Sequence, residues 1–354
     1  MCWHAASRRK ICTGTETRRR MADLFRFPQK MKSFAVIGNP IAHSRSPEIH
    51  LAFAKQTGMA ISYRRLEAPV TADDSGFAEV VRAFFADGGV GMNVTAPFKD
   101  AAFRLASAVS ERSRLAEAAN TLTNDGQGGW RADNTDGIGL VRDLTGRLGL
   151  SLAGRRLLIL GAGGATAGIL GPLLDARPSQ VVLWNRSADK AQRLVRRFAA
   201  AYPEVALETI SSQKHFPSPA PSGHPLPQAG EGKEATDLNR RISDQPPFDL
   251  VIHATSLKAG ASGARANEIT HEIATAWPWL ESSCSPATFF YDLSYADNGE
   301  TLFLRWVKSW AKSPDGGRRS DGLGMLVEQA AESFRIWHGC LPETTAVYAA
   351  LRDK

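Results

Sequence analysis

Apolar and polar positions follow one another in blocks that predict strands and helices in alternation. Short apolar or alternating runs typical of strands lie at 33–38, 61–67, 91–95, 120–123, 157–160, 181–184, near 205, at 249–256 and at 289–295. The run at 120–123 begins a pair of strands that turns at Asp125 and Gly126. Segments with helical spacing lie at 47–57, 73–86, 110–119, 138–148, 188–200 and 321–338, in the apolar run before Val181, and from Pro342 onward. Strands that alternate with helices predict an α/β fold built on largely parallel sheets.

The stretch 157–186 carries the most specific local pattern. A strand of four apolar residues runs into Gly161, Gly163 and Gly164, a helix follows, and a second strand ends after Trp184. Gly161 permits a tight turn, while Gly163 and Gly164 leave room for a pyrophosphate beside the amides that begin the helix. A glycine cluster that only packs a helix is the plainer interpretation, but the strand before it and the helix after it favour dinucleotide binding.

The residues after the second strand indicate which dinucleotide is bound. A site for NAD typically has a carboxylate there, but this chain has Asn185, Arg186, Ser187 and, one turn later, Lys190. Cations at a helix start oppose the helix dipole unless an anion joins them, so NADP with its 2′-phosphate is favoured. The alternative is that Arg186 and Lys190 are solvated cations at the start of a helix and bind no phosphate.

Four polar residues in the first half are candidates for ligand contacts. Ser44 and Ser46 lie beside the helix that Pro47 begins, where Ser46 is either the N-cap or one of two hydroxyls that hold a small carboxylate. Lys99 lies in a first helical turn at the carboxyl end of a strand, the edge where α/β sheets bind ligands, although such a lysine is commonly a surface residue. Asp136 is either a helix N-cap or a functional carboxylate.

Composition and charge exclude several classes of protein. The 354 residues are 43% hydrophobic and 22% charged, which is ordinary for a globular chain, and no apolar run approaches the roughly 20 residues of a membrane span. The net charge is +7, but residues 1–30 contain eight Lys or Arg and two acidic residues, so about +1 remains for the rest. We therefore expect neither a nucleic-acid-binding face nor a membrane partner.

Two segments are expected to lie outside the folded core. The basic leader, 1–31, is an organelle presequence, a disordered tail or a misassigned start; we favour the last, with Met31 or Met21 as the true start. The segment 211–247, rich in Pro, Gly, Ser and charge, is expected to be a flexible insertion without chemistry.

The cysteines and histidines suggest no bridge and no metal site. The four cysteines have no paired spacing and the eight histidines form no ligand motif. We therefore expect reduced thiols in the cytoplasm.

Eight motifs together identify a resemblance. In chain order they are GNPIAHSRSP, NVTAPFK, AANTL, DNTDG, GAGGA, NRSADK, DLSY and DGLGMLVEQA. With them the chain resembles the shikimate dehydrogenase family over about 33–354, apart from the insertion. The resemblance implies an amino-terminal α/β substrate-binding domain, 32–137 with 324–354, a Rossmann-type NADP-binding domain, 138–323, and an active site in the cleft between them.

The resemblance also implies the functional residues. Lys99 and Asp136 are the implied catalytic pair. The implied substrate contacts are Ser44, Ser46, Thr95, Lys99, Asn120, Asp136, Tyr295 and Gln329. The implied NADP(H) contacts are Glu111, Gly161, Ala162, Gly163, Gly164, Ala165, Asn185, Arg186, Ser187, Lys190, Leu293 and Gly322.

The implied activity is reversible, NADPH-dependent reduction of 3-dehydroshikimate to shikimate, on the route to chorismate and the aromatic amino acids. Lys99 or Asp136 takes the hydroxyl proton during oxidation, and which of the two does so stays open. A homodimer is one expectation. Two departures from the family's usual pattern are Ala96, in place of Val, and His253, in place of Asn.

Three other functions stay open. One is a quinate/shikimate dehydrogenase that uses NAD, and another is a catalytically silent NADP-binding regulatory protein. The third is nucleic-acid binding through the basic leader, which predicts binding that weakens as salt rises.

Overall fold

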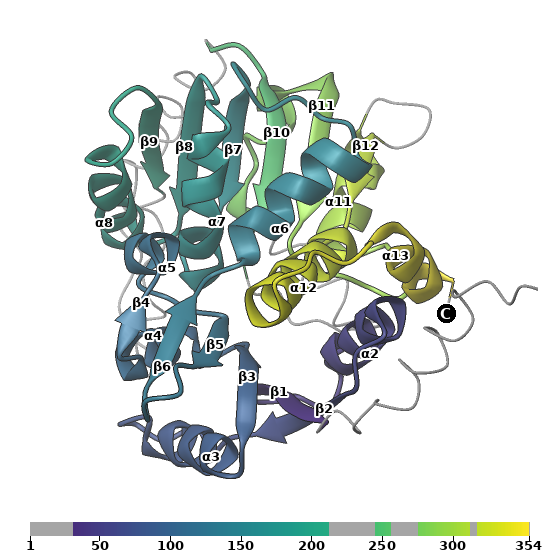
Figure 1. Ribbon diagram of the computed structural model, residues 1–354. Coiled ribbons are helices and arrows are strands. Elements are labelled where there is room, and N and C mark those ends of the chain that lie inside the picture. Colours follow the sequence, from purple (N-terminus) through teal and green to yellow (C-terminus); the bar gives the residue numbers. More distant parts are fainter. Residues whose placement is uncertain (1–30, 212–244, 256–274, 312–316, 354) are drawn as a thin grey trace, which may run out of the picture.

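Two sheets form the frame of the molecule. The computed structural model describes residues 31–211, 245–255, 275–311 and 317–353, so the predicted leader and most of the predicted insertion lie outside the described residues. Figure 1 shows the first sheet below the second, with the long helix α12 between them and beside α6. The predicted α/β class is confirmed.

The first sheet has six strands in the order β2-β1-β3-β5-β6-β4. They are β1 (Lys32–Gly38), β2 (Ile61–Glu67), β3 (Gly89–Val94), β4 (Ala108–Val109), β5 (Thr121–Asn124) and β6 (Trp130–Asp133). β1 pairs in parallel with β2 and β3, and β5 pairs antiparallel with β3 and β6. The helices around it are α2 (Ser46–Thr57), α3 (Ser75–Ala86), α4 (Lys99–Leu105), α5 (Glu111–Ala116), α12 (Leu323–His338) and α13 (Thr345–Arg352).

The second sheet is fully parallel, in the order β12-β11-β10-β7-β8-β9. Its strands are β7 (Arg156–Leu160), β8 (Gln180–Asn185), β9 (Ala206–Ser211), β10 (Phe248–His253), β11 (Cys284–Asp292) and β12 (Arg318–Ser320). Its helices are α6 (Asp136–Arg142), which runs into a π-helical turn (Asp143–Arg147), then α7 (Gly164–Asp175), α8 (Ala188–Ala199), a short 3₁₀ turn (Glu281–Ser283) and α11 (Leu302–Trp310).

The apolar strands are buried on both faces. Leu157 and Ile159 of β7 pack in one core, whereas Leu158 and Leu160 pack in the core on the opposite face. Successive side chains of a strand point to opposite faces, so a continuous apolar run is what a doubly covered parallel strand needs. Each buried leucine of this kind contributes roughly 1.5–3 kcal/mol.

Several predicted boundaries are corrected. α2 begins at Ser46 itself, and the residue before it is Arg45, so the predicted N-cap role of Ser46 is wrong. The last helix begins at Thr345 rather than at Pro342, and the helix predicted from Ile138 begins at Asp136.

Four of the described elements had no predicted counterpart: the short strands β4 and β12, the 3₁₀ turn and the helix α11. None of the described helices has the length and apolar character to cross a membrane.

Candidate active site

Three segments of the chain meet at one edge of the first sheet. β3 ends at Val94, β5 begins at Thr121 and β6 ends at Asp133, and the antiparallel pairing places these three termini together. The side chains that follow or precede them are those of Lys99, Asn120 and Asp136. Chain segments far apart in sequence therefore deliver the candidate catalytic groups to one place.

Lys99 and Asp136 form a close ion pair. Lys99 Nζ lies 2.6 Å from Asp136 Oδ2, and the side chains are 24% and 7% exposed. Asn120 Nδ2 donates to the other carboxylate oxygen, Asp136 Oδ1, at 2.8 Å. Both oxygens of the carboxylate are thus held, while the ammonium keeps some access to the outside.

Asp136 also lies against the helix that begins at the glycine turn. A Cβ added at Gly168 of α7 would lie 3.1 Å from Asp136 Oδ2. The glycine lets the carboxylate approach α7 closely, so the ion pair of the first sheet sits beside a helix of the second.

Gln329 joins the same group from α12. Asn120 Nδ2 lies 3.2 Å from Gln329 Oε1, and the Gln329 amide donates to the carbonyl of Leu326 at 2.9 Å. Thr135 Oγ1 lies 2.9 Å from Asn120 Nδ2. The structure therefore brings together four of the predicted substrate residues: Lys99, Asn120, Asp136 and Gln329.

The predicted hydroxyl pair is present at the start of α2. Ser44 Oγ donates to Ser46 Oγ at 3.2 Å. Arg65 of β2 donates from Nε to the carbonyl of Ser44 at 2.8 Å, which fixes the loop that carries the pair. Burial raises the pKa of Tyr295, and the nearby positive charges of Arg45 and Arg65 partly lower it. A positively charged, hydroxyl-lined corner of this kind suits a carboxylate.

Thr95 follows β3 directly and packs against the end of β1. A Cβ added at Gly38 would lie 2.5 Å from Thr95 Cγ2. Gly38 therefore provides the space that Thr95 occupies at the sheet edge.

The glycine turn has the form expected for a phosphate site. Gly161 has φ +118°, which favours glycine, and a Cβ added at Gly163 or Gly164 would meet nothing within 4 Å. α7 begins at Gly164, so the amides of its first turn have no partners within the helix. Ala162 lies in the turn, and Ala165 lies in the first turn of α7.

The end of β8 is tied to this turn. Asn185 Oδ1 accepts from the amide of Ala162 at 3.2 Å, and its Nδ2 donates to the carbonyl of Ser187 at 2.9 Å. Arg186 and Lys190 are exposed, and neither has a hydrogen-bond or ion-pair partner in the part of the chain that the structure describes. Two free cations thus lie next to an open turn, which fits the 2′-phosphate and pyrophosphate of NADP.

Leu293 and Gly322 contact each other on the other side of the turn. A Cβ added at Gly322 would lie 2.3 Å from the carbonyl oxygen of Leu293, so only glycine fits there. The amide of Leu293 donates to the carbonyl of His253 at 2.9 Å.

Among the described residues, Glu111 has no hydrogen bond or ion pair with the other predicted cofactor residues; its ion-pair partner is Arg114. It is exposed at the start of α5, where it forms an ion pair with Arg114 that lowers its pKa. Its negative charge also contributes to the raised pKa of Tyr202. The hydroxyl of Tyr202 lies beside Gly171, two turns along α7 from the glycine turn. Its cofactor role stays a prediction.

Sequence reasoning missed a buried polar chain behind the site. Tyr63 donates to Asn93 Oδ1 at 2.7 Å, and Asn93 Nδ2 donates to Ser333 Oγ at 2.9 Å and to the carbonyl of Asn120 at 3.2 Å. The available signal was an asparagine inside an otherwise apolar strand, which needs partners when it is buried.

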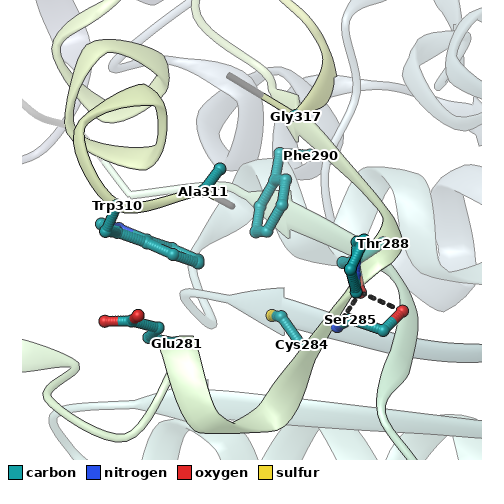
Figure 2. Close-up of a pocket in the computed structure, with 9 residues that line it drawn as sticks. Glu281, Cys284, Ser285, Thr288, Phe290, Trp310, Ala311 and Gly317 are labelled. Atoms are coloured by element: carbon teal, nitrogen blue, oxygen red, sulfur yellow. Dashed lines mark hydrogen bonds between the residues drawn. The ribbon is translucent and has the colours of Figure 1, made fainter. Parts of the chain in front are cut away.

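A small hollow lies at the opposite end of the second sheet. It measures about 80 Å³ and is lined by residues including Cys284, Phe290 and Trp310 (Figure 2). β11 begins at Cys284, so the hollow is at the amino edge of the sheet, away from the glycine turn. Burial raises the pKa of the Cys284 thiol to about 12, so the thiol is not a nucleophile at neutral pH.

The fold and the site together define a two-domain α/β protein of the dinucleotide-binding class. Three family models match successive parts of the chain. They describe a shikimate dehydrogenase substrate binding domain at 36–122, a shikimate/quinate 5-dehydrogenase at 143–214 and a shikimate 5′-dehydrogenase C-terminal domain at 322–352.

Full-length relatives agree with these matches. The chain is 42% identical to the shikimate dehydrogenase (NADP(+)) of Cupriavidus necator, over 90% of this chain and 92% of that protein. An Ael1 enzyme from Pseudomonas putida superposes with a TM-score of 0.67 at 36% identity, over 90% and 98% of the two chains. The shikimate 5-dehydrogenase of Thermus thermophilus, solved with shikimate, gives 0.65 at 25% identity, over 91% and 98%. The chain belongs to the shikimate dehydrogenase family.

Proposed function

We propose that this chain catalyses the reversible, NADPH-dependent reduction of 3-dehydroshikimate to shikimate, on the route to chorismate and the aromatic amino acids. The observation that carries the proposal is the ion pair of Lys99 and Asp136, at 2.6 Å, placed beside α7. The relatives named as NADP(+)-dependent shikimate dehydrogenases support it.

The residues at the glycine turn fit NADP. Gly163 and Gly164 leave open space at the start of α7, and Arg186 and Lys190 are free to bind a phosphate among the described residues. When bound, the cofactor supplies the nicotinamide that exchanges a hydride with the substrate. We propose that the turn binds the pyrophosphate and that Arg186 and Lys190 favour NADP over NAD by contacting the 2′-phosphate.

We assign proton transfer to the ion pair of Lys99 and Asp136. Oxidation of a secondary alcohol needs a group that takes the hydroxyl proton as the carbonyl forms and returns it in the reverse direction. Lys99 is partly exposed, while Asp136, itself held by Asn120, keeps the ammonium in place.

The substrate carboxylate is assigned to the corner at Ser44 and Ser46. Their hydroxyls lie 3.2 Å apart and the charges of Arg45 and Arg65 lie nearby. We propose that Thr95, Asn120, Tyr295 and Gln329 complete the contacts with the ring hydroxyls.

The described cysteines, Cys284 and Cys340, are free thiols, and we propose a cytoplasmic location in keeping with them.

Lys99→Ala tests the proposal. Loss of a general acid/base should lower kcat for shikimate oxidation by about 10²–10⁴-fold and leave the Kd for NADP⁺ within about twofold. Lys55→Ala, at an exposed lysine in the last turn of α2, is the matched control and should behave as wild type. A Lys99→Ala enzyme with kcat within tenfold of wild type would refute the assignment.

A further inference from the structure

His253 and Asp292 pair at the edge of the second sheet that faces the cofactor residues. They are the last residues of β10 and β11 and lie opposite each other in the register of the two strands. Neither side chain is more than 2% exposed. The pair is therefore inside the protein and not itself a ligand contact.

Both ring nitrogens of His253 are engaged. Nδ1 lies 2.9 Å from Asp292 Oδ1, and Nε2 lies 2.5 Å from Thr255 Oγ1. A carboxylate accepts hydrogen bonds, so Nδ1 donates to Asp292, and the other ring nitrogen, Nε2, pairs with the hydroxyl of Thr255. The chain of contacts from Asp292 through His253 fixes the orientation of Thr255.

The ring itself is held by aromatic packing. It stacks on Phe303 with ring centroids 4.5 Å apart and 15° between planes, and Trp277 meets its edge at 5.6 Å. This packing fixes the ring plane, so the two hydrogen bonds have a set direction.

Asp292 holds the loop that follows β11. Its Oδ1 also accepts from the amide of Ser294 at 3.0 Å, and its Oδ2 accepts from Thr301 Oγ1 at 2.6 Å. Ser294 in turn accepts the amide of Gly322 at 2.9 Å. The loop of Leu293 is thus anchored to the same carboxylate.

The loops held by the pair contact the predicted cofactor residues. A Cβ at Gly161 would lie 3.0 Å from the carbonyl oxygen of Ala254 and 3.1 Å from Thr255 Cγ2. The carbonyl of His253 accepts the amide of Leu293. The glycine turn and Leu293 therefore both rest on backbone that the His253 and Asp292 side chains position.

We propose that His253 is a positioning residue for NADP(H): through Asp292 and Thr255 it sets the two loops that flank the glycine turn and Leu293. The proposal rests on the proposed function, since it concerns the same cofactor site. It concerns binding of the dinucleotide and not the proton transfer at Lys99.

His253→Phe tests it in the full-length protein. Phenylalanine keeps the stack on Phe303 and loses both hydrogen bonds, so the Kd for NADP⁺ by isothermal titration should rise about tenfold, and that for shikimate should stay within twofold. His253→Asn restores a donor and an acceptor and should return the Kd for NADP⁺ to within about threefold of wild type.

His338→Phe is the matched control. That ring packs on Phe34 and Phe334 of the first sheet's core, and its Nε2 has no hydrogen-bond partner among the described residues. Its Kd for NADP⁺ should equal that of wild type.

Thr255→Val is a second, nearly isosteric test should His253→Phe fail to fold, and it should raise the Kd for NADP⁺ about threefold. An unchanged Kd in the folded variants, or an equal loss of shikimate and NADP⁺ binding, overturns the inference. If wild type itself binds no NADP⁺, the proposed function fails instead.

Discussion

Asp136 has a different partner on each carboxylate oxygen, Lys99 on one and Asn120 on the other. That arrangement explains why an aspartate that begins a helix is buried and does not cap it. Without the family resemblance, Asp136 was also consistent with a helix N-cap, and Lys99 was more typical of a surface residue. Their 37-residue separation conceals a contact that only the antiparallel pairing of β3, β5 and β6 creates.

Arg186 is the residue whose charge should select the cofactor. Arg186→Asp removes a cation next to the turn and adds repulsion, so the Kd for NADP⁺ should rise about 10–100-fold, from the loss of one charge-assisted hydrogen bond. The Kd for NAD⁺, which lacks the 2′-phosphate, should change by less than about threefold.

Arg82→Asp is the control. Arg82 is exposed on α3 beside the first sheet, so this substitution makes the same charge change far from the glycine turn. An equal loss for both dinucleotides in Arg186→Asp would show that this arginine does not contact the phosphate.

Other residues show where sequence reasoning stops. The role of the glycines at 161, 163 and 164 could be predicted, because a glycine cluster between a strand and a helix indicates a tight backbone turn with room for a phosphate. The partner of His253 could not, because Asp292 lies 39 residues away and is joined to it only by strand register. Ser46 was misplaced as an N-cap because cap and first helical residue differ by one position.

At the scale of elements, α6 and α12 pack closely because of glycine. A Cβ at Gly139 would lie 2.6 Å from the backbone nitrogen of Gln329, and one at Gly324 would lie 2.0 Å from Asp143 Oδ1. The two helices therefore cross at positions that lack side chains, and this crossing holds Gln329 near Asn120. The predicted helices gave no indication of this contact, since it joins segments about 190 residues apart.

Gly139→Ala should push the two helices apart. We expect a loss of about 1–3 kcal/mol in the free energy of unfolding in urea, together with a raised KM for shikimate, because Gln329 moves with its helix. Gly146→Ala is the matched control: it lies just beyond α6, and an added Cβ there meets nothing within 4 Å. Wild-type stability and KM in Gly139→Ala would contradict the proposed role of this crossing.

The strands were predicted better than the short edge elements. β1 and β7 have continuous apolar runs that only a strand covered on both faces needs. β4 and β12 have two and three residues, too few for any periodicity, and tertiary pairing alone defines them.

At the scale of the whole molecule, the site draws on both sheets. Lys99 and the serine pair come from the segments of the first sheet, and the glycine turn comes from the second. α12 packs with Phe34 of the first core and lies beside α6, so one helix links the two parts. The alternation of strands and helices predicted the α/β class, and the ordered motifs predicted the family, whereas the contacts between the two sheets required the structure.

Initial rates with shikimate and with quinate, each with NADP⁺ and with NAD⁺, test the central claim most directly. The positive corner at Ser44 and Ser46 suits the carboxylate of either substrate and does not distinguish them. We expect shikimate because of the family to which the chain belongs. We expect NADP⁺ because Arg186 and Lys190 are free cations among the described residues. We predict that shikimate with NADP⁺ is the fastest combination by at least about tenfold, a difference of roughly 1.4 kcal/mol in activation free energy. Comparable rates with quinate or NAD⁺, or no turnover from folded protein that binds NADP⁺, would contradict the account.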